Sequence, residues 1–144
     1  MSGSKERVVV VPCSGIGKAF GSVSREAAYE LCEELRPNDT RIVALSKLVL
    51  GDAEARGLVA HSPTVTIDGC QHMCAAKMVR ESGGQVAREV AVLDVFRRHK
   101  DLKAEGIAEL NEAGRTLARV IAGEVAGDLE SIRASGSAKG GNHA

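Results

Sequence analysis

The chain has 144 residues, a length that fits one domain of the commonest size, roughly 100 to 150 residues. Its 19 basic and 19 acidic residues give zero formal charge, and aromatic residues make up only 2% of it. The sequence therefore lacks the basic surplus and the stacking aromatic residues that are typical of nucleic-acid binding, and nothing in it predicts binding to a membrane.

Apolar runs rich in valine and isoleucine alternate along the chain with segments of helical periodicity. The runs predict buried strands, which we place at 7–12, 40–45, 64–67 and 86–95. The first periodic segment predicts a helix that begins near Ser22 or Ser24, because either serine is a good N-cap, and that ends at residue 35. Further helices are expected at 52–60, at 70–81 and, as one or two helices, at 103–132.

This alternation of strands and helices predicts the fold class. We expect an α/β fold with a small, open, mostly parallel sheet of about four strands, doubly wound in the Rossmann or flavodoxin-like manner, and with C-terminal helices. Right-handed crossovers would place the first and third strands side by side, with the second strand on the far side of the first. One domain is expected to span residues 1–134, and the Gly- and Ser-rich residues 135–144 are expected to form a flexible tail.

Three of the four cysteines follow the ends of two predicted strands. Cys13 ends the first strand, and Cys70 and Cys74 follow the third strand and its Asp68-Gly69 turn. If these strands are parallel neighbours, the three thiols meet at the edge where open α/β sheets place their sites. The first residues are not followed by an apolar segment of signal-peptide length, so we expect a cytoplasmic protein whose thiols stay reduced. Metal binding or catalysis is then favoured over a disulfide.

The spacing of Cys70 and Cys74 favours a shared metal ion. In a helix over 70–81, positions i and i+4 lie on one face, with Cβ atoms about 5–6 Å apart. Thiolates are common ligands of zinc, which takes four ligands in structural sites and keeps one position open in catalytic sites. We therefore predict a zinc site held by Cys13, Cys70 and Cys74. Cys32 lies within an apolar helical stripe and is assigned to the core.

The fourth position on the metal is left to water, His72, Asp68 or Cys32. His72 lies two residues from Cys70, which is a rotation of about 200° around a helix, so it would point away from the metal. An incomplete shell suits a site that handles a ligand. We expect that ligand to be a small thiol or an anion.

The loop after the first predicted strand offers a second candidate site. Gly15 and Gly17 would let the backbone approach a ligand closely, and Lys18 is available to an anionic group. The glycine spacing matches neither the dinucleotide-binding fingerprint nor the Walker A motif. Glycines that permit a tight strand–helix turn explain this loop more simply.

Three short motifs resemble those of the DGC-domain family: Pro12-Cys13-Ser14-Gly15, Asp68-Gly69-Cys70 and Cys74-Ala75-Ala76-Lys77. The resemblance runs from about Val8 to Val95. It implies a small cysteine-rich α/β domain that is proposed to bind zinc, with the same three cysteines as ligands by matching position. The family often has further cysteines near the positions of Ala44 and Thr64, and a proline at that of Gln71. A four-cysteine site is therefore not implied for this chain.

Three other functions stay open. Cys70 is the candidate nucleophile of a thiol redox or sulfur-carrier protein, with Cys13 or Cys74 as its partner thiol. Thiolates are also the ligands that hold iron–sulfur clusters. A structural or interaction domain with incidental cysteines would need neither chemistry. The sequence alone does not decide whether the protein is an enzyme.

Overall fold

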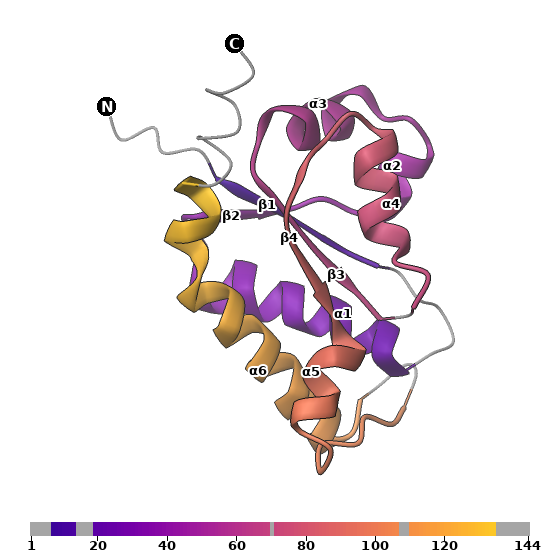
Figure 1. The fold of residues 1–144 in the computed structure, drawn as a ribbon, viewed down its shortest axis with the longest axis vertical. Helices are drawn as coiled ribbons and strands as arrows, with labels where there is room; N and C mark the ends of the chain where they lie inside the picture. The colour runs from indigo at the N-terminus through magenta and orange to yellow at the C-terminus, as the bar shows by residue number, and fades with distance from the viewer. Residues whose placement is uncertain (1–6, 14–18, 70, 107–109, 135–144) are drawn as a thin grey trace.

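The computed structural model describes residues 7–13, 19–69, 71–106 and 110–134, and the expected tail at 135–144 lies outside these ranges. None of the helices that the structure describes is long and apolar enough to cross a membrane. The described residues form a sheet of four parallel strands with helices on both faces (Figure 1). The predicted α/β class is confirmed.

The strands follow the spatial order β2-β1-β3-β4, and they are β1 (Val8–Pro12), β2 (Thr40–Ile42), β3 (Thr64–Asp68) and β4 (Val86–Ala91). β1 and β3 pair in parallel, with Pro12 opposite Ile67. The predicted adjacency of the first and third strands is therefore confirmed, and so is the outer position of the second. Because β1 and β3 end together, the residues that follow them leave the sheet at one edge, which we call the carboxyl edge.

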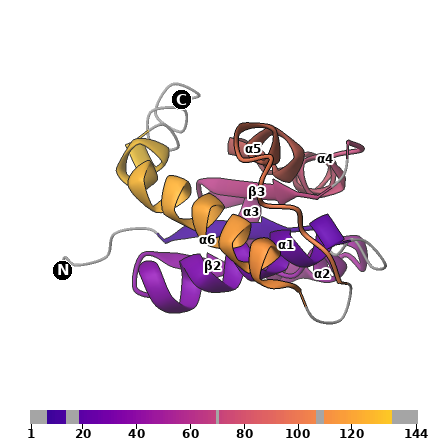
Figure 2. The same cartoon turned by 90° about the horizontal axis from the view of Figure 1, so that it is seen from below.

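Helices cover the two faces of the sheet in separate layers. Figures 1 and 2 show α1, α5 and α6 on one face of the sheet, with α6 lying across α1, and α2, α3 and α4 on the other. The first face carries α1 (Ala19–Tyr29), α5 (Val92–Arg98) and α6 (Glu112–Gly127). The second carries α2 (Leu45–Val49), α3 (Ala53–His61) and α4 (Cys74–Glu81).

The valines of β1 supply both cores. Val8 and Val10 belong to the apolar cluster on the α1, α5 and α6 face, and Val9 and Val11 belong to the cluster on the opposite face. All four are at most 1% exposed. This is the alternation that the pleat of a strand imposes, and it explains why β1 is an uninterrupted apolar run: a strand covered on both faces has no solvent side.

The first helix begins earlier than the sequence predicted. α1 starts at Ala19, so Ser22 and Ser24 lie buried inside the helix, and neither is its N-cap. The Ser24 hydroxyl donates to the carbonyl oxygen of Gly21 at 2.7 Å and to that of Cys13 at 3.1 Å. A serine that bonds back to the preceding turn has its polar group satisfied within a helix, which is why it misled the prediction.

Two later boundaries also differ from the prediction. β4 ends at Ala91 rather than at 95, because Val92 and Val95 form the buried face of α5. The helical segment expected from 103 begins only at Glu112, where the Asn111 side chain caps its first turn. The short helix α2 was not predicted, whereas α3 agrees closely with the helix expected at 52–60.

The chain continues from α1 as a π-helical segment, η1 (Glu30–Leu35). It ends with the N–H of Arg36 donating to the carbonyl of Leu31 at 2.8 Å, a bond five residues back along the chain. The wider turn shifts the angular phase of the helix. Leu31 therefore stays fully buried, whereas Leu35, four residues later, is 41% exposed.

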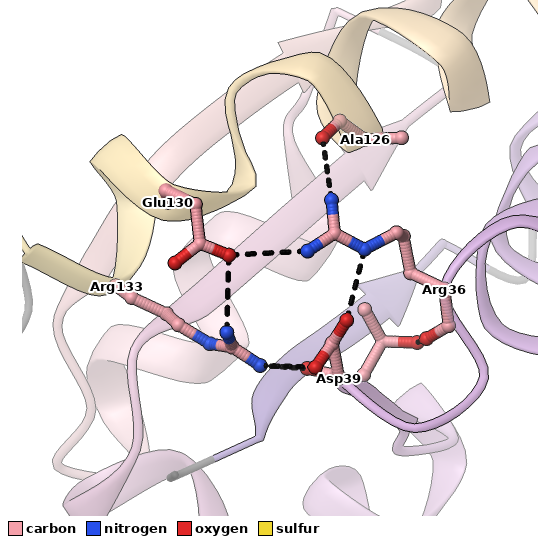
Figure 3. Close-up of polar contacts among 6 residues, drawn as sticks. Arg36, Asp39, Ala126, Glu130 and Arg133 are labelled. Atoms are coloured by element: carbon pink, nitrogen blue, oxygen red, sulfur yellow. Dashed lines mark hydrogen bonds and ion pairs between the residues drawn. The ribbon is translucent and has the colours of Figure 1, made fainter.

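A cluster of charged side chains joins Glu130 and Arg133, near the C-terminal end of the described chain, to the segment that precedes β2 (Figure 3). Arg36 donates to Asp39 at 2.9 Å and to Glu130 at 3.1 Å. Arg133 donates to the same Glu130 oxygen at 3.1 Å and to the second oxygen of Asp39 at 2.8 Å. We call these four residues the C-terminal clasp. Asp39 directly precedes β2, so the clasp lies at the amino ends of the strands, opposite the carboxyl edge.

Candidate functional site

Cys13 lies at the carboxyl edge, one residue beyond β1. Its N–H donates to the carbonyl of Ile67 at 2.8 Å, so the ladder between β1 and β3 extends to the cysteine itself. Its side chain belongs to the apolar cluster on the α2, α3 and α4 face, and the residue is only 3% exposed. The sheet therefore positions this thiol, which gives the firm placement that a ligand or a nucleophile needs.

The backbone of the Asp-Gly-Cys motif contacts the Cys13 sulfur directly. The N–H of Gly69 donates to Cys13 Sγ with a nitrogen–sulfur distance of 3.0 Å. The hydroxyl oxygen of Ser24 lies 3.4 Å from the same sulfur. The thiolate is the form of cysteine that binds metals, and a donor aimed at the sulfur is an interaction that a metal-bound thiolate can keep.

Gly69 makes this contact because it has no side chain. A Cβ atom at this position would lie 2.5 Å from the carbonyl oxygen of Phe20 and 2.8 Å from the nitrogen of Gly21. Both atoms belong to the backbone of α1, which cannot move aside as a flexible side chain would. Glycine is therefore required for the segment after β3 to pass close to α1 and reach the Cys13 sulfur.

Asp68, the last residue of β3, caps α4 from seven residues upstream. Its two carboxylate oxygens accept hydrogen bonds from the N–H groups of Ala75 at 2.7 Å and Ala76 at 3.2 Å. These amides lie in the first turn of α4, where they have no partner within the helix. Burial raises the pKa of the Asp68 carboxyl, and the two amides offset only part of that effect. Through these two hydrogen bonds Asp68 orients the start of α4.

This remote cap overturns one sequence-based argument. α4 begins at Cys74 rather than at 70, residues 71–72 form a turn, and Met73 has the left-handed φ of 52°. The prediction that Cys70 and Cys74 share one face of a helix is therefore wrong, and so is the argument that helical rotation points His72 away. The helix starts where the buried Asp68 carboxylate accepts hydrogen bonds from the amides of Ala75 and Ala76.

The structure describes two of the three predicted metal ligands. Cys13 contacts the turn after β3 through its sulfur, and Cys74 is the neighbour of Ala75, which binds Asp68 at the start of the same turn. Cys13 is buried and Cys74 is exposed. The Asp68-Gly69 segment thus contacts a protected cysteine, Cys13, directly, and the residue that follows an accessible cysteine, Cys74.

Several predicted site residues lie outside the described residues: Cys70, Gly15, Gly17 and Lys18. Within the part of the chain that the structure describes, no group of three or more His, Cys, Asp or Glu side chains is arranged to hold a metal ion. The two described cysteines, Cys13 and Cys74, offer thiols, which are soft ligands of the kind that zinc accepts.

Cys32 lies at the opposite edge of the sheet. It is a half-buried residue of η1 that packs against the core on the α1, α5 and α6 face. Burial raises the pKa of the Cys32 thiol, and a side-chain hydrogen bond with Thr40 offsets part of this increase. Thr40 is the first residue of β2. Thr40 pairs with Val8 at the start of β1, so roughly the length of that strand, about 15 Å, separates Cys32 from Cys13. This supports the core assignment and removes Cys32 from the candidate fourth ligands.

Two contributors to the site were missed by sequence reasoning. Ser24 was taken for an N-cap, and its contact with Cys13 joins residues that no helical or strand period relates. Asp68 was considered only as a turn residue and a possible ligand. The sequence did contain a feature that could have predicted the capping role of Asp68. It is an acidic residue between a buried strand and the next helix, and the free amides at a helix start favour an anion.

The comparisons with known proteins identify one family. The family described as the DGC domain matches residues 9–120. The matched segment contains the carboxyl edge and ends before Glu130 and Arg133 of the C-terminal clasp. No curated protein and no solved structure matches the chain.

Proposed function

The chain belongs to the DGC-domain family, and from this premise we propose that it binds zinc at the carboxyl edge through the thiolates of Cys13, Cys70 and Cys74. Such a site needs reduced thiols. We place the protein in the cytoplasm, where thiols are kept reduced.

The observation that carries the proposal is the hydrogen bond from the Gly69 N–H to the Cys13 sulfur. It anchors one thiol on the residue that directly precedes Cys70. Cys74 is anchored on the same turn, because the next residue, Ala75, binds the Asp68 carboxylate at 2.7 Å. These contacts explain why the three cysteines and the Asp-Gly pair occur together: the pair joins the strand that positions Cys13 to the helix that carries Cys74.

Three thiolates and one Zn²⁺ would carry a net charge of −1 and would leave one position open. Zinc in such a position acts as a Lewis acid or holds an exchangeable ligand. We propose that a small thiol or an anion binds there. His72 is a further candidate for the fourth position, because it lies in the turn between two of the proposed ligands and is not held away by a helix.

Metal analysis of protein purified without chelators tests this proposal. We expect about one zinc per chain, a colourless protein and little iron. Native-state thiol titration should then find fewer reactive thiols than the four cysteines of the sequence. A metal content far below one per chain, together with four freely reactive thiols, would refute zinc binding, whereas a brown protein with stoichiometric iron would identify an iron–sulfur site.

A thiol redox function is the second candidate, and the exposure of Cys74 at the first position of α4 favours it. In this alternative the Cys70 thiolate attacks a disulfide substrate and one substrate thiol leaves. Cys74 then displaces the second substrate thiol as it forms a disulfide with Cys70, so the substrate is reduced and the protein is oxidised. Mass spectrometry after equilibration with oxidised glutathione would detect this reversible loss of two hydrogens in metal-free protein.

A further inference from the structure

A pocket of about 440 Å³ opens at the carboxyl edge beside Gly69. Its walls are apolar, formed mainly by Phe20 and Leu93 with Ala104, and two polar side chains, Gln71 and His72, also line it. The volume falls within the range of small-molecule sites, about 300–1,000 Å³. The mixture of apolar walls with a few polar groups is also typical of such sites.

The pocket lies where the sheet topology predicts a ligand. The chain leaves β1 to build β2 on one side, and it later builds β3 on the other side of β1. In open α/β sheets, this reversal opens a crevice outside the carboxyl ends of the two central strands. Phe20 belongs to the helix that follows β1, and Gly69 directly follows β3. Residues from both sides of the reversal therefore line the pocket.

Packing already holds the apolar wall in place. The rings of Phe20 and Phe96 lie with their centroids 5.5 Å apart at an angle of 55°, a favourable tilted arrangement. Phe96 and Leu93 are both residues of α5, so this helix supplies one wall and supports the other. On the opposite side, the missing side chain of Gly69 lets the turn approach Phe20. Helices α1 and α5 thus supply the apolar wall, and the segments that contain Gly69, Gln71 and His72 close the other side.

The lining residues restrict the kind of ligand. None of the described lining residues is Lys, Arg, Asp or Glu. A phosphate or a carboxylate would find no fixed opposite charge among them, and burial of an unpaired charge against apolar walls is costly. An uncharged aromatic ring can contact the Phe20 ring and the Leu93 side chain, while a neutral hydroxyl or amide can bond to Gln71 and His72, which both donate and accept.

We propose that this pocket binds a small uncharged molecule with a flat apolar body, which contacts Phe20 and Leu93 and is oriented by Gln71 and His72. This binding does not require a metal, and any reaction of the molecule at the cysteines rests on the proposed function.

An NMR titration tests the proposal with three probes of similar size and different charge: benzyl alcohol, benzoate and benzylamine. Benzyl alcohol should bind with a Kd of about 1 mM, as expected for a ligand of this size, and should shift the amide signals of Phe20, Leu93 and Ala104. Benzoate and benzylamine should bind at least about fivefold more weakly. The titration is run on zinc-loaded and on metal-free protein.

Leu93→Trp, which fills the pocket, should weaken binding of benzyl alcohol at least about tenfold. Leu50→Trp is the matched control, because Leu50 is 84% exposed and is not among the lining residues; it should change the Kd less than about twofold. Ala104→Phe is a second blocking variant, and circular dichroism establishes that each variant is folded. Unchanged binding in folded Leu93→Trp and Ala104→Phe, or benzoate binding as tight as benzyl alcohol, would overturn the proposal. Absence of zinc with benzyl alcohol still bound would refute the proposed function alone.

Discussion

The N–H of Gly69 donates to the sulfur of Cys13 at 3.0 Å, and the same glycine packs against the α1 backbone where a Cβ atom would lie 2.5 Å from the carbonyl oxygen of Phe20. The cysteine at the end of β1 and the glycine after β3 therefore hold one another in place. This contact links two of the three cysteine-bearing motifs of the chain, and the predictions about the site begin from it.

Gly69→Ala should destabilise the protein by about 1–3 kcal/mol, because the added methyl group overlaps backbone atoms that can move only with α1. It should also reduce zinc retention, because the displaced amide no longer reaches the Cys13 sulfur. Gly57→Ala is the control: it lies within α3, a Cβ atom there would meet nothing within 4 Å, and the change should stabilise the helix by about 0.5–1 kcal/mol. Urea unfolding and elemental analysis measure the two effects. Equal stability of the two variants would contradict the close approach.

The cysteines should divide into two classes when they are replaced singly. Cys13→Ser, Cys70→Ser and Cys74→Ser should each lower the zinc content strongly, because each removes a proposed thiolate ligand. Cys32→Ala should keep the metal and lose only packing, about 1 kcal/mol in the free energy of unfolding. Elemental analysis and urea unfolding of all four variants check this division. Loss of zinc from Cys32→Ala with retention in Cys13→Ser would show that the ligand assignment is wrong.

Asp68→Asn should destabilise the protein at neutral pH by about 1 kcal/mol, the usual effect of losing a helix cap. An asparagine side chain has a single acceptor oxygen, so it cannot receive the N–H groups of both Ala75 and Ala76 as the carboxylate does. A control for the loss of one acidic residue is Asp94→Asn, because Asp94 is 69% exposed and 3.5 Å from its Arg97 partner. Urea unfolding should find Asp94→Asn within about 0.5 kcal/mol of the wild type.

The effect of Asp68→Asn on the free energy of unfolding should depend on pH. Burial raises the pKa of Asp68 in the folded state, so the folded protein binds more protons than the unfolded chain between the ordinary aspartate value, about 3.9, and the raised one. The contribution of Asp68 to stability therefore falls as the pH rises through this window. The stability difference between wild type and Asp68→Asn should accordingly be larger near pH 3 than at pH 7 in urea unfolding. A difference that grows with pH would contradict the raised pKa.

The C-terminal clasp should have the opposite pH dependence. The Arg133 and Arg36 guanidinium groups hold the pKa of the Asp39 carboxyl below its usual value. The resulting stabilisation is present above the unfolded value of about 3.9 and is lost as the pH falls through the lowered folded pKa. Asp39→Asn should therefore cost about 1 kcal/mol at pH 7 and nothing measurable at pH values below the folded pKa. A cost that persists unchanged at such low pH would show that the ion pairs in Figure 3 do not contribute through charge.

Local patterns were sufficient to predict the sheet. The four successive valines of β1 and the complete burial of β3 have one cause, because both faces of a central parallel strand are covered. The uninterrupted valine run can be recognised in the sequence alone. The rule of right-handed crossovers then placed β1 beside β3. These two steps brought Cys13 and the Asp-Gly-Cys motif to one edge, which the contact between Gly69 and Cys13 bears out.

Contacts between segments decided the rest. Helical periodicity placed Cys70 inside α4, but the buried Asp68 carboxylate binds the amides of Ala75 and Ala76 and fixes the start of the helix at Cys74. Ser24 satisfied the local rule for an N-cap, yet its hydroxyl bonds to the end of β1. The sequence by itself thus determined which residues reach the carboxyl edge, because strand formation and crossover handedness depend on local pattern. Only the tertiary structure decided how those residues are oriented there, because caps and close backbone approaches join atoms that no sequence period relates.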